Sequence, residues 1–565
     1  MLSTNIGSAG GAVNTSGTNL AIDSDAQFAD AGTIDNIAIG RNALNSTTDD
    51  ATYNLAIGVD VLTANTTGDY NIGIGHKAMN LLIEGNKNIA IGAFALDYAN
   101  DTAASGGAPF DNIAIGYQAL TTLRGNDNTK NIAIGSEAMQ ASTGNTVTGN
   151  VCIGHKAGYN TSGDENVLIG LETAYNTDSD DNVCIGYRAE YNNTVGHRSI
   201  AIGTKASQAA TGAGKGYYSV AIGFNAFHEA NHTSHNGSIA IGYKAGYYVN
   251  PDTGSDSTAG NTLIGFKAGM DETNSQGVTT GRFNTAVGHQ TLGANCGSSG
   301  NITGRSNTVI GYRSGWILKT SASYNTFMGA QSGVNVTTGD YNTAIGWKAL
   351  AYDGSTALTG SSNVCVGFHS GRKLEGDGAE NVFIGSYAGD ACTTGDSNVS
   401  IGYASDVSAA NNNQIAIGNG VVTDAADQLR IGDAANYLTF DFSSGGGTIA
   451  VTSDKRIKKD IVDTDLGIDF INKLRPVKFT PKNEFDYPDE FGLDKSGKRP
   501  EDPTERQDGL IAQEVKAVID EMNVTFSGWS ENLETRQQLE YSKFITPLIK
   551  AVQELSQQIE DLKKG

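Results

Sequence analysis

Three histidines, His228, His232 and His235, have the H-x3-H-x2-H spacing of a metal-binding loop. No carboxylate or cysteine is fixed beside them, so a polar loop is the simpler interpretation, and we expect no metal ion or other cofactor. No pair of carboxylates stands out as a glycoside-hydrolase site. These residues therefore predict no enzyme that acts on an external substrate.

A second group that could do chemistry is the run Ser453-Asp-Lys-Arg-Ile-Lys-Lys-Asp-Ile461. A serine hydroxyl becomes a nucleophile when a base takes its proton, and a lysine can be that base when burial or neighbouring cations lower its pKa. Lys458 has such cations around it. Five residues separate it from Ser453, about 140° around a helix and opposite faces of a strand, so a turn or a neighbouring subunit must bring them together. By itself, the run is typical of a solvated basic surface.

The chain that carries this run has two parts of different amino-acid composition. Residues 453–565 hold 41 charged side chains in 113 positions, whereas residues 1–452 hold 58 in 452. The longer part contains 66 of the 72 glycines, and the shorter part contains six of the eight prolines. Such a shift predicts a domain boundary.

Charge and hydropathy exclude several partners. A formal net charge of −23 argues against binding to nucleic-acid phosphates. No run of eighteen apolar residues is present, so we expect no membrane insertion. The first residues have no basic and apolar signal pattern, and an odd five cysteines indicate no disulfide framework. Together these features predict synthesis in a reducing cytoplasm.

The longer part is an array of internal repeats. The segment Asn36-Ile-Ala-Ile-Gly40 is the first of 21 copies of a repeat, the last being Gln414-Ile-Ala-Ile-Gly418. The glycines are spaced by 16 to 24 residues, so a short fixed core is followed by a loop of variable length.

Each column of the repeat predicts a role. The residue before the glycine is Ile in 18 copies, which predicts a buried stack of aliphatic side chains. The strand is apolar on both faces, so we expect both faces of the strand to be covered by other parts of the protein. The unvarying glycine indicates a tight corner with positive φ or close backbone approach. Small residues three positions later predict a crowded packing site. Asn begins 17 copies and predicts a ladder of amide hydrogen bonds.

Two further columns have more than one interpretation. Cys152, Cys184 and Cys365 occupy the middle of the strand and are expected in the core. An aromatic residue or histidine follows the glycine in 12 copies. Such a stripe could stack on the sugars of a cell-surface glycan, but a packing ladder is the interpretation that we favour.

One short strand per repeat predicts a parallel β-solenoid, packed with other copies around one axis. The C-terminal residues predict a helix with two apolar columns at heptad spacing: Ile545, Val552 and Ile559, and Leu548, Leu555 and Leu562. In a coiled coil, β-branched residues in the first of these heptad columns with Leu in the second favour a dimer. We nevertheless expect the shaft to impose a trimer.

Both parts resemble known families. The repeat resembles the trimeric left-handed β-roll in the head of trimeric autotransporter adhesins, and the shafts of bacteriophage tail fibres. Four motifs resemble the endosialidase-type intramolecular chaperone: the run from Ser453, Leu474-Arg-Pro-Val-Lys-Phe479, Gly509-Leu-Ile-Ala-Gln-Glu-Val515 and Leu539-Glu-Tyr-Ser-Lys-Phe-Ile-Thr-Pro-Leu548. That domain closes phage tail spikes and fibres and then cuts itself off.

The resemblance implies a single-turnover self-cleaving endopeptidase. Ser453 and Lys458 match its cleaving pair, so the scissile bond would be Thr452–Ser453. Removal of the chaperone after assembly would leave the shaft kinetically trapped.

We therefore expect a mostly β chain: an N-terminal segment or attachment region (1–35), a trimeric solenoid shaft of about 21 repeats (36–432), a distal tip or linker (433–452), and a small α+β chaperone domain ending in a coiled-coil helix (453–565). The predicted protein is a tail fibre or spike of the virion, made in the host cytoplasm. Its expected partners are two further copies, a virion tail or baseplate component, and a host cell-surface glycan or protein.

Two other functions stay open. A trimeric bacterial surface adhesin is disfavoured because the sequence shows no signal peptide and no membrane anchor. A spike that depolymerises host glycan would release reducing ends from host polysaccharide. The long polar loops near 97–111, 247–260, 270–283 and 292–306 are candidate receptor contacts or tolerated insertions.

Overall fold

The computed structural model divides the chain into two compact units, Met1–Thr452 and Ser453–Gly565. The residues that it describes are 13–14, 19–22, 35–47, 51–97, 109–122, 129–141, 147–193, 196–208, 217–228, 236–247, 259–270, 281–293, 304–318, 321–351, 354, 356–442, 448–451, 455–488, 499, 501–531 and 536–565.

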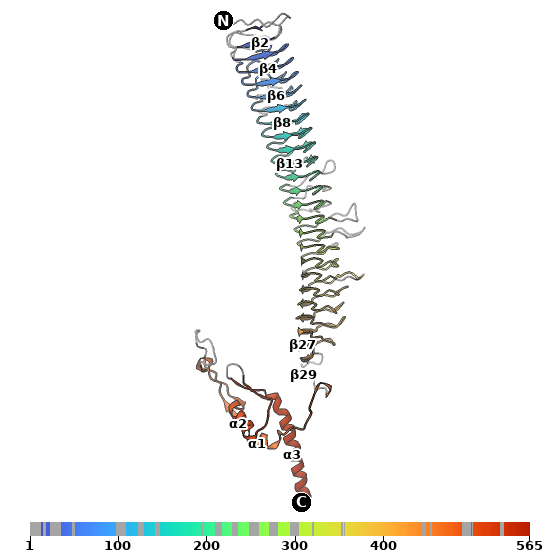
Figure 1. The fold of residues 1–565 in the computed structure, drawn as a ribbon, viewed down its shortest axis with the longest axis vertical. Coiled ribbons are helices and arrows are strands. Elements are labelled where there is room, and N and C mark those ends of the chain that lie inside the picture. Colours follow the sequence, from blue (N-terminus) through green and yellow to red (C-terminus); the bar gives the residue numbers. More distant parts are fainter. Residues whose placement is uncertain are drawn as a thin grey trace. The chain divides into compact units, whose positions relative to one another are not determined.

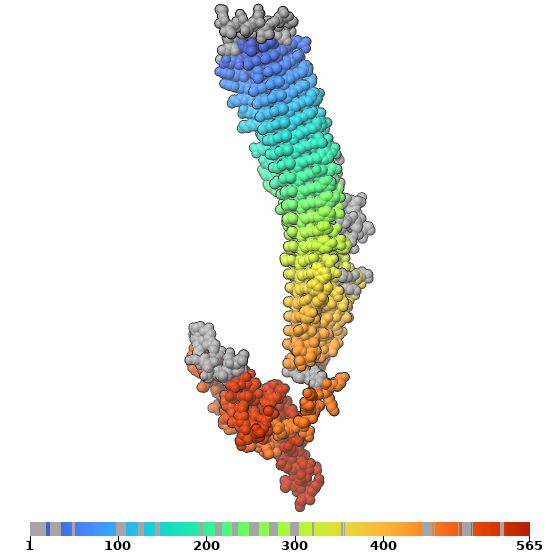
Figure 2. Space-filling model, in the orientation of Figure 1, coloured from blue at the N-terminus to red at the C-terminus, as the bar shows by residue number. Residues whose placement is uncertain are grey.

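The N-terminal unit is a parallel β-solenoid, and each of the 21 repeats forms one of its strands (Figure 1). Neighbouring strands pair in parallel and in register, so that Val220 lies opposite Ile239 and Ala221 opposite Ala240. The coils form successive rows of one rod (Figure 2).

The strands of the repeats are β3 (Ile37–Ile39), β4 (Leu55–Ile57), β5 (Ile72–Ile74), β6 (Ile89–Ile91), β7 (Ile113–Ile115), β8 (Ile132–Ile134), β9 (Val151–Ile153), β11 (Val167–Ile169), β13 (Val183–Ile185), β15 (Ile200–Ile202), β16 (Val220–Ile222), β17 (Ile239–Ile241), β18 (Thr262–Ile264), β19 (Thr285–Val287), β20 (Thr308–Ile310), β21 (Thr326–Met328), β22 (Thr343–Ile345), β23 (Val364–Val366), β24 (Val382–Ile384), β25 (Val399–Ile401) and β26 (Ile415–Asn419).

The ladder begins one coil before residue 36. β2 (Leu20–Ile22) pairs in parallel with β3, and the backbone N–H of Asn36 donates to Asn19 Oδ1 at 2.8 Å. Asp23 stands where the repeat has its glycine, so the glycine pattern does not mark this coil. β1 (Val13–Asn14) pairs antiparallel with β2. A second short parallel ladder joins β10 (Asn160–Thr161), β12 (Asn176–Thr177) and β14 (Asn192–Asn193).

Each strand has an inner and an outer face. Ala240, in the middle of β17, is fully buried, whereas Ile239 and Ile241 on either side are only half-buried within the single chain. Side chains alternate along a strand, so the isoleucine before the glycine shares the outer face with the first residue of the strand. The aliphatic stack therefore exists and is only half-buried within the single chain. That other copies cover it stays a prediction.

The glycine corner satisfies both conditions that the sequence suggested. The repeat glycines have φ between 119° and 140°. At Gly75, an added Cβ would lie 2.6 Å from the carbonyl oxygen of Gly92 in the next coil. No other residue therefore fits the corner without moving the neighbouring backbone.

The core inside the coils is narrow and consists of stacked columns. The small residue three positions after the glycine is fully buried, as Ala43 and Ala245 illustrate, and this column was predicted correctly. The side chains of Cys152, Cys184 and Cys365 are also fully buried, which confirms their assignment to the core. Burial raises the pKa of the Cys152 and Cys365 thiols, so neither is a reactive thiolate.

The predicted amide ladder runs along the coils. The backbone N–H of Asn342 donates to Asn325 Oδ1 at 2.9 Å, and its own Oδ1 accepts the backbone N–H of Asn363 at 3.0 Å. The Asn342 Nδ2 also donates to the Gly360 carbonyl at 3.1 Å, which ties the strand to the following loop. Each asparagine thus satisfies buried backbone groups of neighbouring coils.

Three successive coils replace the asparagine with serine. Ser199 Oγ lies 3.2 Å from Ser219 Oγ, and the backbone N–H of Asn261 donates to Ser238 Oγ at 3.1 Å. A serine continues the ladder through its hydroxyl but has no amide that could also reach the loop. The ladder therefore continues through hydroxyl groups in this part of the solenoid.

The parallel ladder ends in antiparallel strands. β27 (Gln428–Asp433) pairs in parallel with β26 and antiparallel with β28 (Tyr437–Asp441), which pairs in turn with β29 (Thr448–Val451). The change of direction ends the addition of parallel coils.

The C-terminal unit is a small α+β domain. Its elements are η1 (Lys455–Ile457), α1 (Ile468–Lys473), β30 (Val477–Phe479), η2 (Glu484–Asp486), β31 (Gln507–Gly509), α2 (Ala512–Met522), β32 (Trp529–Glu531), β33 (Gln537–Leu539), η4 (Tyr541–Phe544) and α3 (Ile545–Lys564). Its core comprises Leu466, Phe470, Val515, Ile519, Phe526 and Phe544. Within the described residues, no helix combines the length and apolar composition needed to cross a bilayer.

Candidate processing site and association surfaces

The two residues of the predicted scissile bond, Thr452 and Ser453, lie outside the described residues. The description resumes in η1, and Lys458 follows it directly. The Lys458 backbone N–H donates to the Lys455 carbonyl at 3.1 Å, which closes a tight turn.

The basic run lies in water in the single chain. Lys458 is exposed, and Lys459 Nζ lies 3.9 Å from Asp460 Oδ2 with both side chains almost fully exposed. Ion pairs this exposed contribute little to stability. The desolvation that turns a lysine into a base would therefore have to come from a further surface.

The other motifs of the C-terminal unit pack together. Arg475 Nε donates to Glu514 Oε2 at 2.9 Å, and the same guanidinium holds the pKa of the Glu514 carboxyl below its usual range. The Leu510 backbone N–H donates to the Tyr541 hydroxyl at 2.8 Å. The sequence alone gave Arg475 and Glu514 no role, although their opposite charges within two motifs were a usable signal.

An open cavity of about 760 Å³ lies between α2, β32 and the start of α3, and we refer to it as the α2–α3 groove. Its apolar lining comprises Leu466, Ile519, Val524, Phe526, Trp529 and Pro547. Its polar lining includes Lys516, Asp520, Lys543 and Thr525. The sequence contained no short-range signal for this groove, because its walls come from four separate segments.

Helix α3 leaves its apolar stripe uncovered in the single chain. The predicted heptad residues are between 44% and 81% exposed, and Ile549 beside them is 54% exposed. An apolar stripe of this length is typical of a helix that packs against other helices.

The outer faces of the solenoid strands form a second uncovered apolar surface, which we refer to as the outer band. In every repeat, the first and third strand residues are half-buried or exposed, with Met328 at 43% and Ile384 at 40% among the most exposed. A band this long is unusual for a chain that works alone.

Part of the aromatic column beside this band forms a packing ladder. The rings of Phe224 and Tyr243 lie 5.4 Å apart and 7° from parallel, and those of Tyr243 and Phe266 lie 5.1 Å apart and 11° from parallel. Stacked rings cover one another's faces and leave only their edges outside. This geometry favours a structural role over a platform for sugar rings.

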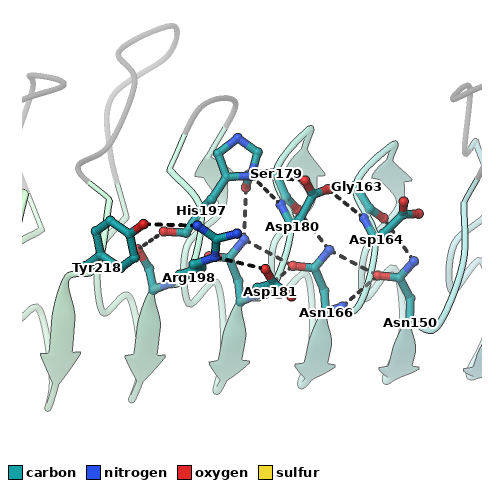
Figure 3. Close-up of polar contacts among 12 residues, drawn as sticks. Asn150, Gly163, Asp164, Asn166, Ser179, Asp180, Asp181, His197, Arg198 and Tyr218 are labelled. Carbon is teal, nitrogen blue, oxygen red and sulfur yellow. Dashed lines mark hydrogen bonds and ion pairs between the residues drawn. The ribbon is translucent and has the colours of Figure 1, made fainter.

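A second polar ladder involves titratable side chains (Figure 3). The Asp164 backbone N–H donates to Asp180 Oδ1 at 2.8 Å, and the Asp180 N–H donates to His197 Nδ1 at 2.8 Å. Asp164 in turn accepts the Thr148 N–H at 2.7 Å, and burial raises the pKa of its carboxyl. These side chains connect neighbouring coils, which accounts for their alignment without a catalytic role.

The histidine motif is only partly described. The His228 ring stacks on Tyr247, with centroids 5.0 Å apart, while His232 and His235 lie outside the described residues. Among the side chains that the structure describes, no group of three or more His, Cys, Asp or Glu is arranged to hold a metal ion. Most of each long loop proposed as a receptor contact also lies outside this set.

Residues 453–523 match the family Peptidase_S74, the chaperone of endosialidase. This match covers most of the C-terminal unit, which is therefore similar to the chaperone of endosialidase. The match begins at Ser453 and spans the first three of the four motifs, through α2. No curated protein and no solved structure matches the chain.

Proposed function

We propose that this protein is a bacteriophage tail fibre or tail spike, built as a homotrimeric shaft that contacts the host cell surface. Its C-terminal domain aligns three chains and then removes itself by cleaving the Thr452–Ser453 bond. The observation that carries this proposal is the combination of a parallel solenoid with a chaperone-of-endosialidase domain that begins at Ser453.

The position of the cleavage is supported by two independent boundaries. The division of the chain into two compact units falls between Thr452 and Ser453. The family match starts at the same residue. Cleavage there would separate the units without cutting either one.

Self-association is supported by the outer band and by α3. Both surfaces are apolar and both are uncovered in the single chain; the outer band includes every repeat, and the apolar stripe extends along α3. Burial of such surfaces yields about 25 cal/mol per Å², so two long strips favour assembly strongly. Three copies around one axis would cover the outer band of every chain.

The proposed cleavage uses residues of the chain alone. Lys458, as a neutral amine, takes the proton of the Ser453 hydroxyl, and the Ser453 oxygen attacks the Thr452 carbonyl carbon. The bond from that carbon to the Ser453 nitrogen breaks, and the protonated Lys458 returns the proton to the leaving nitrogen. Water then hydrolyses the ester, which frees the Thr452 carboxylate and the Ser453 hydroxyl.

A tail fibre also needs contacts at its two ends. We propose that one end joins a virion tail or baseplate component and that the shaft or its loops bind a host cell-surface glycan or protein. The acidic shaft and the stacked aromatic column provide no argument for glycan hydrolysis, so binding is the proposed role.

The test is the intact mass of the purified protein beside Ser453→Ala and Lys458→Ala variants. We expect the wild type to split into residues 1–452 and 453–565 and both variants to stay whole. Lys459→Ala is the matched control and should cleave, because this neighbour has no proposed role. A wild-type trimer that stays whole would overturn the peptidase, and a monomer by light scattering would overturn the trimer.

A further inference from the structure

The middle of the solenoid differs in charge from the rest of the chain. Residues 187–370 hold 11 Lys and Arg against 8 Asp and Glu, whereas the other residues up to 452 hold 9 against 30. The chain as a whole has a net charge of −23. A positively charged stretch within so acidic a chain indicates a surface for an anionic partner.

Six of these cations lie in one column, two positions after the repeat glycine, which we refer to as the basic column. The column is part of the backbone ladder, since the Lys267 N–H donates to the carbonyl of Tyr243, one coil back, at 2.9 Å. In the ten coils whose glycines run from Gly186 to Gly367, neither this column nor the aromatic column before it contains a carboxylate. The six cations are Arg188, Lys205, Lys244, Lys267, Arg313 and Lys348.

Aromatic rings hold these cations in place. Lys244 Nζ lies 5.7 Å from the centre of the Tyr243 ring, and the Arg313 guanidinium carbon lies 5.2 Å from the centre of the Tyr312 ring. Cation–π contacts of this kind restrict the long side chains before any ligand arrives. An anion that binds the basic column therefore pays less of the entropy of ordering those side chains.

The same column contains both charges in the coils on the N-terminal side. Lys156 Nζ lies 3.4 Å from Glu137 Oε2, and Arg188 Nε lies 2.6 Å from Glu172 Oε2. The column thus neutralises its own cations up to Arg188. In the following coils the column itself supplies no such carboxylate, so an external anion has a series of cations to bind.

The aromatic column has a break within this stretch. Ala330 stands where neighbouring coils have rings, and it leaves Tyr312 and Trp347 two coils apart. Stacked rings cover one another's faces, as in Phe266 and His289, whose centres lie 4.7 Å apart in successive coils. The break corresponds to one missing ring of that ladder, and the flanking Tyr312 and Trp347 are 46% and 42% exposed.

A cation lies on each side of the break. Arg313 follows Tyr312, and Lys348 follows Trp347. Arg313 Nε donates to Gln290 Oε1 at 3.0 Å, which directs the guanidinium toward the preceding coil and not into the break. Aromatic rings that pack on an apolar ring face, together with cations that bind a carboxylate, suit a sugar that carries a carboxylate.

We propose that the basic column binds an acidic polysaccharide of the host cell surface and that one of its sugar rings enters the break at Ala330, which rests on the proposed function and assigns the class of its receptor. Successive cations of the column lie one or two coils apart, about 5–10 Å. An extended polysaccharide with a carboxylate on every sugar or every second sugar presents its charges at similar intervals. Six cations in each of three chains would repel one another if they were buried together, so we expect the column to face solvent in the trimer.

The test is binding of the purified protein to polygalacturonate, with dextran as a neutral glycan and poly-L-glutamate as a polycarboxylate that has no sugar ring. We expect polygalacturonate to bind at least tenfold more tightly than either of the others. Arg313→Gln with Lys348→Gln should weaken this binding at least tenfold. The matched control, Lys77→Gln with Lys156→Gln, removes the same two charges from the column outside the basic stretch and should bind as the wild type does.

The break is tested by filling it. Ala330→Phe should continue the ring ladder without lowering the melting temperature, and it should weaken polygalacturonate binding at least tenfold. Ser136→Phe is its matched control, because Ser136 interrupts the same column between Tyr117 and His155 but has Glu137 beside it. This control should bind as the wild type does, and equal losses in the two variants would overturn a site at Ala330.

The remaining outcomes separate this inference from the proposed function. Equal affinities for polygalacturonate and poly-L-glutamate would overturn a saccharide site. A trimer that binds neither glycan would overturn this inference and leave the proposed assembly standing. Light scattering on the same samples reports the assembly, and a monomer that binds polygalacturonate would support the site and overturn the trimer.

Discussion

Single residues control how closely the coils can approach, and the repeat glycines show this most directly. At Gly311, φ is +129° and an added Cβ would lie 2.6 Å from the carbonyl oxygen of Gly329. At Gly376, φ is also positive, at +59°, but the nearest atom to an added Cβ is 3.7 Å away. An added side chain would cause backbone strain at both positions, but it would collide with the next coil only at Gly311.

We expect Gly311→Ala to cost about 3 kcal/mol per chain, because strain at positive φ adds to displacement of the neighbouring backbone. Gly376→Ala should cost about 1 kcal/mol, from the left-handed conformation alone. The rate of thermal unfolding of the cleaved shaft measures the difference. Equal rates in the two variants would contradict close packing at the corner.

Asp406 makes stability depend on pH. Burial raises its pKa to about 6, against the partial opposition of hydrogen bonds from the Ala391 and Val407 backbone N–H groups. Asp390 raises the pKa further, and Lys373 lowers it. In the pH range between the ordinary aspartate value, 3.8, and about 6, the folded chain therefore binds more protons than the unfolded chain.

Stability should consequently fall as the pH rises through this range and level off above it. Asp406→Asn keeps an acceptor for the Ala391 N–H but does not titrate, so its melting temperature should change less between pH 4 and pH 6.5. Thermal melts of both proteins over this range test the expectation. Parallel curves for variant and wild type would exclude Asp406 as the source.

At the scale of elements, the asparagine ladder connects strands that are otherwise very short. Asn342→Ala would leave the buried Asn363 N–H and the Gly360 carbonyl without their partner. Two such losses should cost about 3 kcal/mol per chain. Asn335→Ala removes a more exposed hydrogen bond to the Thr356 carbonyl and should cost under about 1 kcal/mol.

Urea unfolding rates of the two asparagine variants provide the comparison. A ladder that stabilises the shaft requires the Asn342 variant to unfold much faster than the Asn335 variant. Similar rates would mean that water or rearranged backbone replaces the lost hydrogen bonds.

Helix α3 is the element expected to align the chains. Val552 is 65% exposed in the apolar stripe, so Val552→Asp would place three carboxylates together in a trimer and should shift it toward monomer by at least tenfold in concentration. Gln553→Asp adds the same charge at the next, exposed position and should leave assembly unchanged. Sedimentation of both variants in a Ser453→Ala background decides between them.

At the scale of the whole molecule, the solenoid depends on contacts that are distant in sequence, so its register must be set before it can propagate. Residues 1–452 expressed alone should therefore give aggregates or monomers. The same residues released by cleavage from assembled trimer should stay trimeric and resist detergent. Light scattering of the two preparations tests this, and an identical trimer from both would remove the need for a chaperone.

Much of this architecture could be predicted because the same pattern of residues recurs in 21 copies of the repeat. The invariant glycine, the small packing column and the asparagine ladder each follow from a constraint that every coil shares. The coil at Leu20–Ile22 escaped the pattern because Asp23 replaces its glycine, although strand pairing does not require that residue.

The direction of each strand face could not be predicted from the same pattern. The middle residue and its neighbours are all apolar, so alternation alone does not say which one is inside. In the structure the middle residue of the strand lies inside, and it ranges in size from Ala240 to Phe327. The closure of the coil, rather than a difference in polarity, decides the orientation.

The sequence by itself determined the repeat, the boundary at Ser453 and the motifs that resemble the chaperone of endosialidase, since each is a local pattern of residue types. The outward position of the isoleucine stack, the contact of Arg475 with Glu514 and the α2–α3 groove were decided only by the tertiary structure. Each of these features depends on segments that lie far apart along the chain, or on the space between them. The spacing of residues in a sequence gives no information on either.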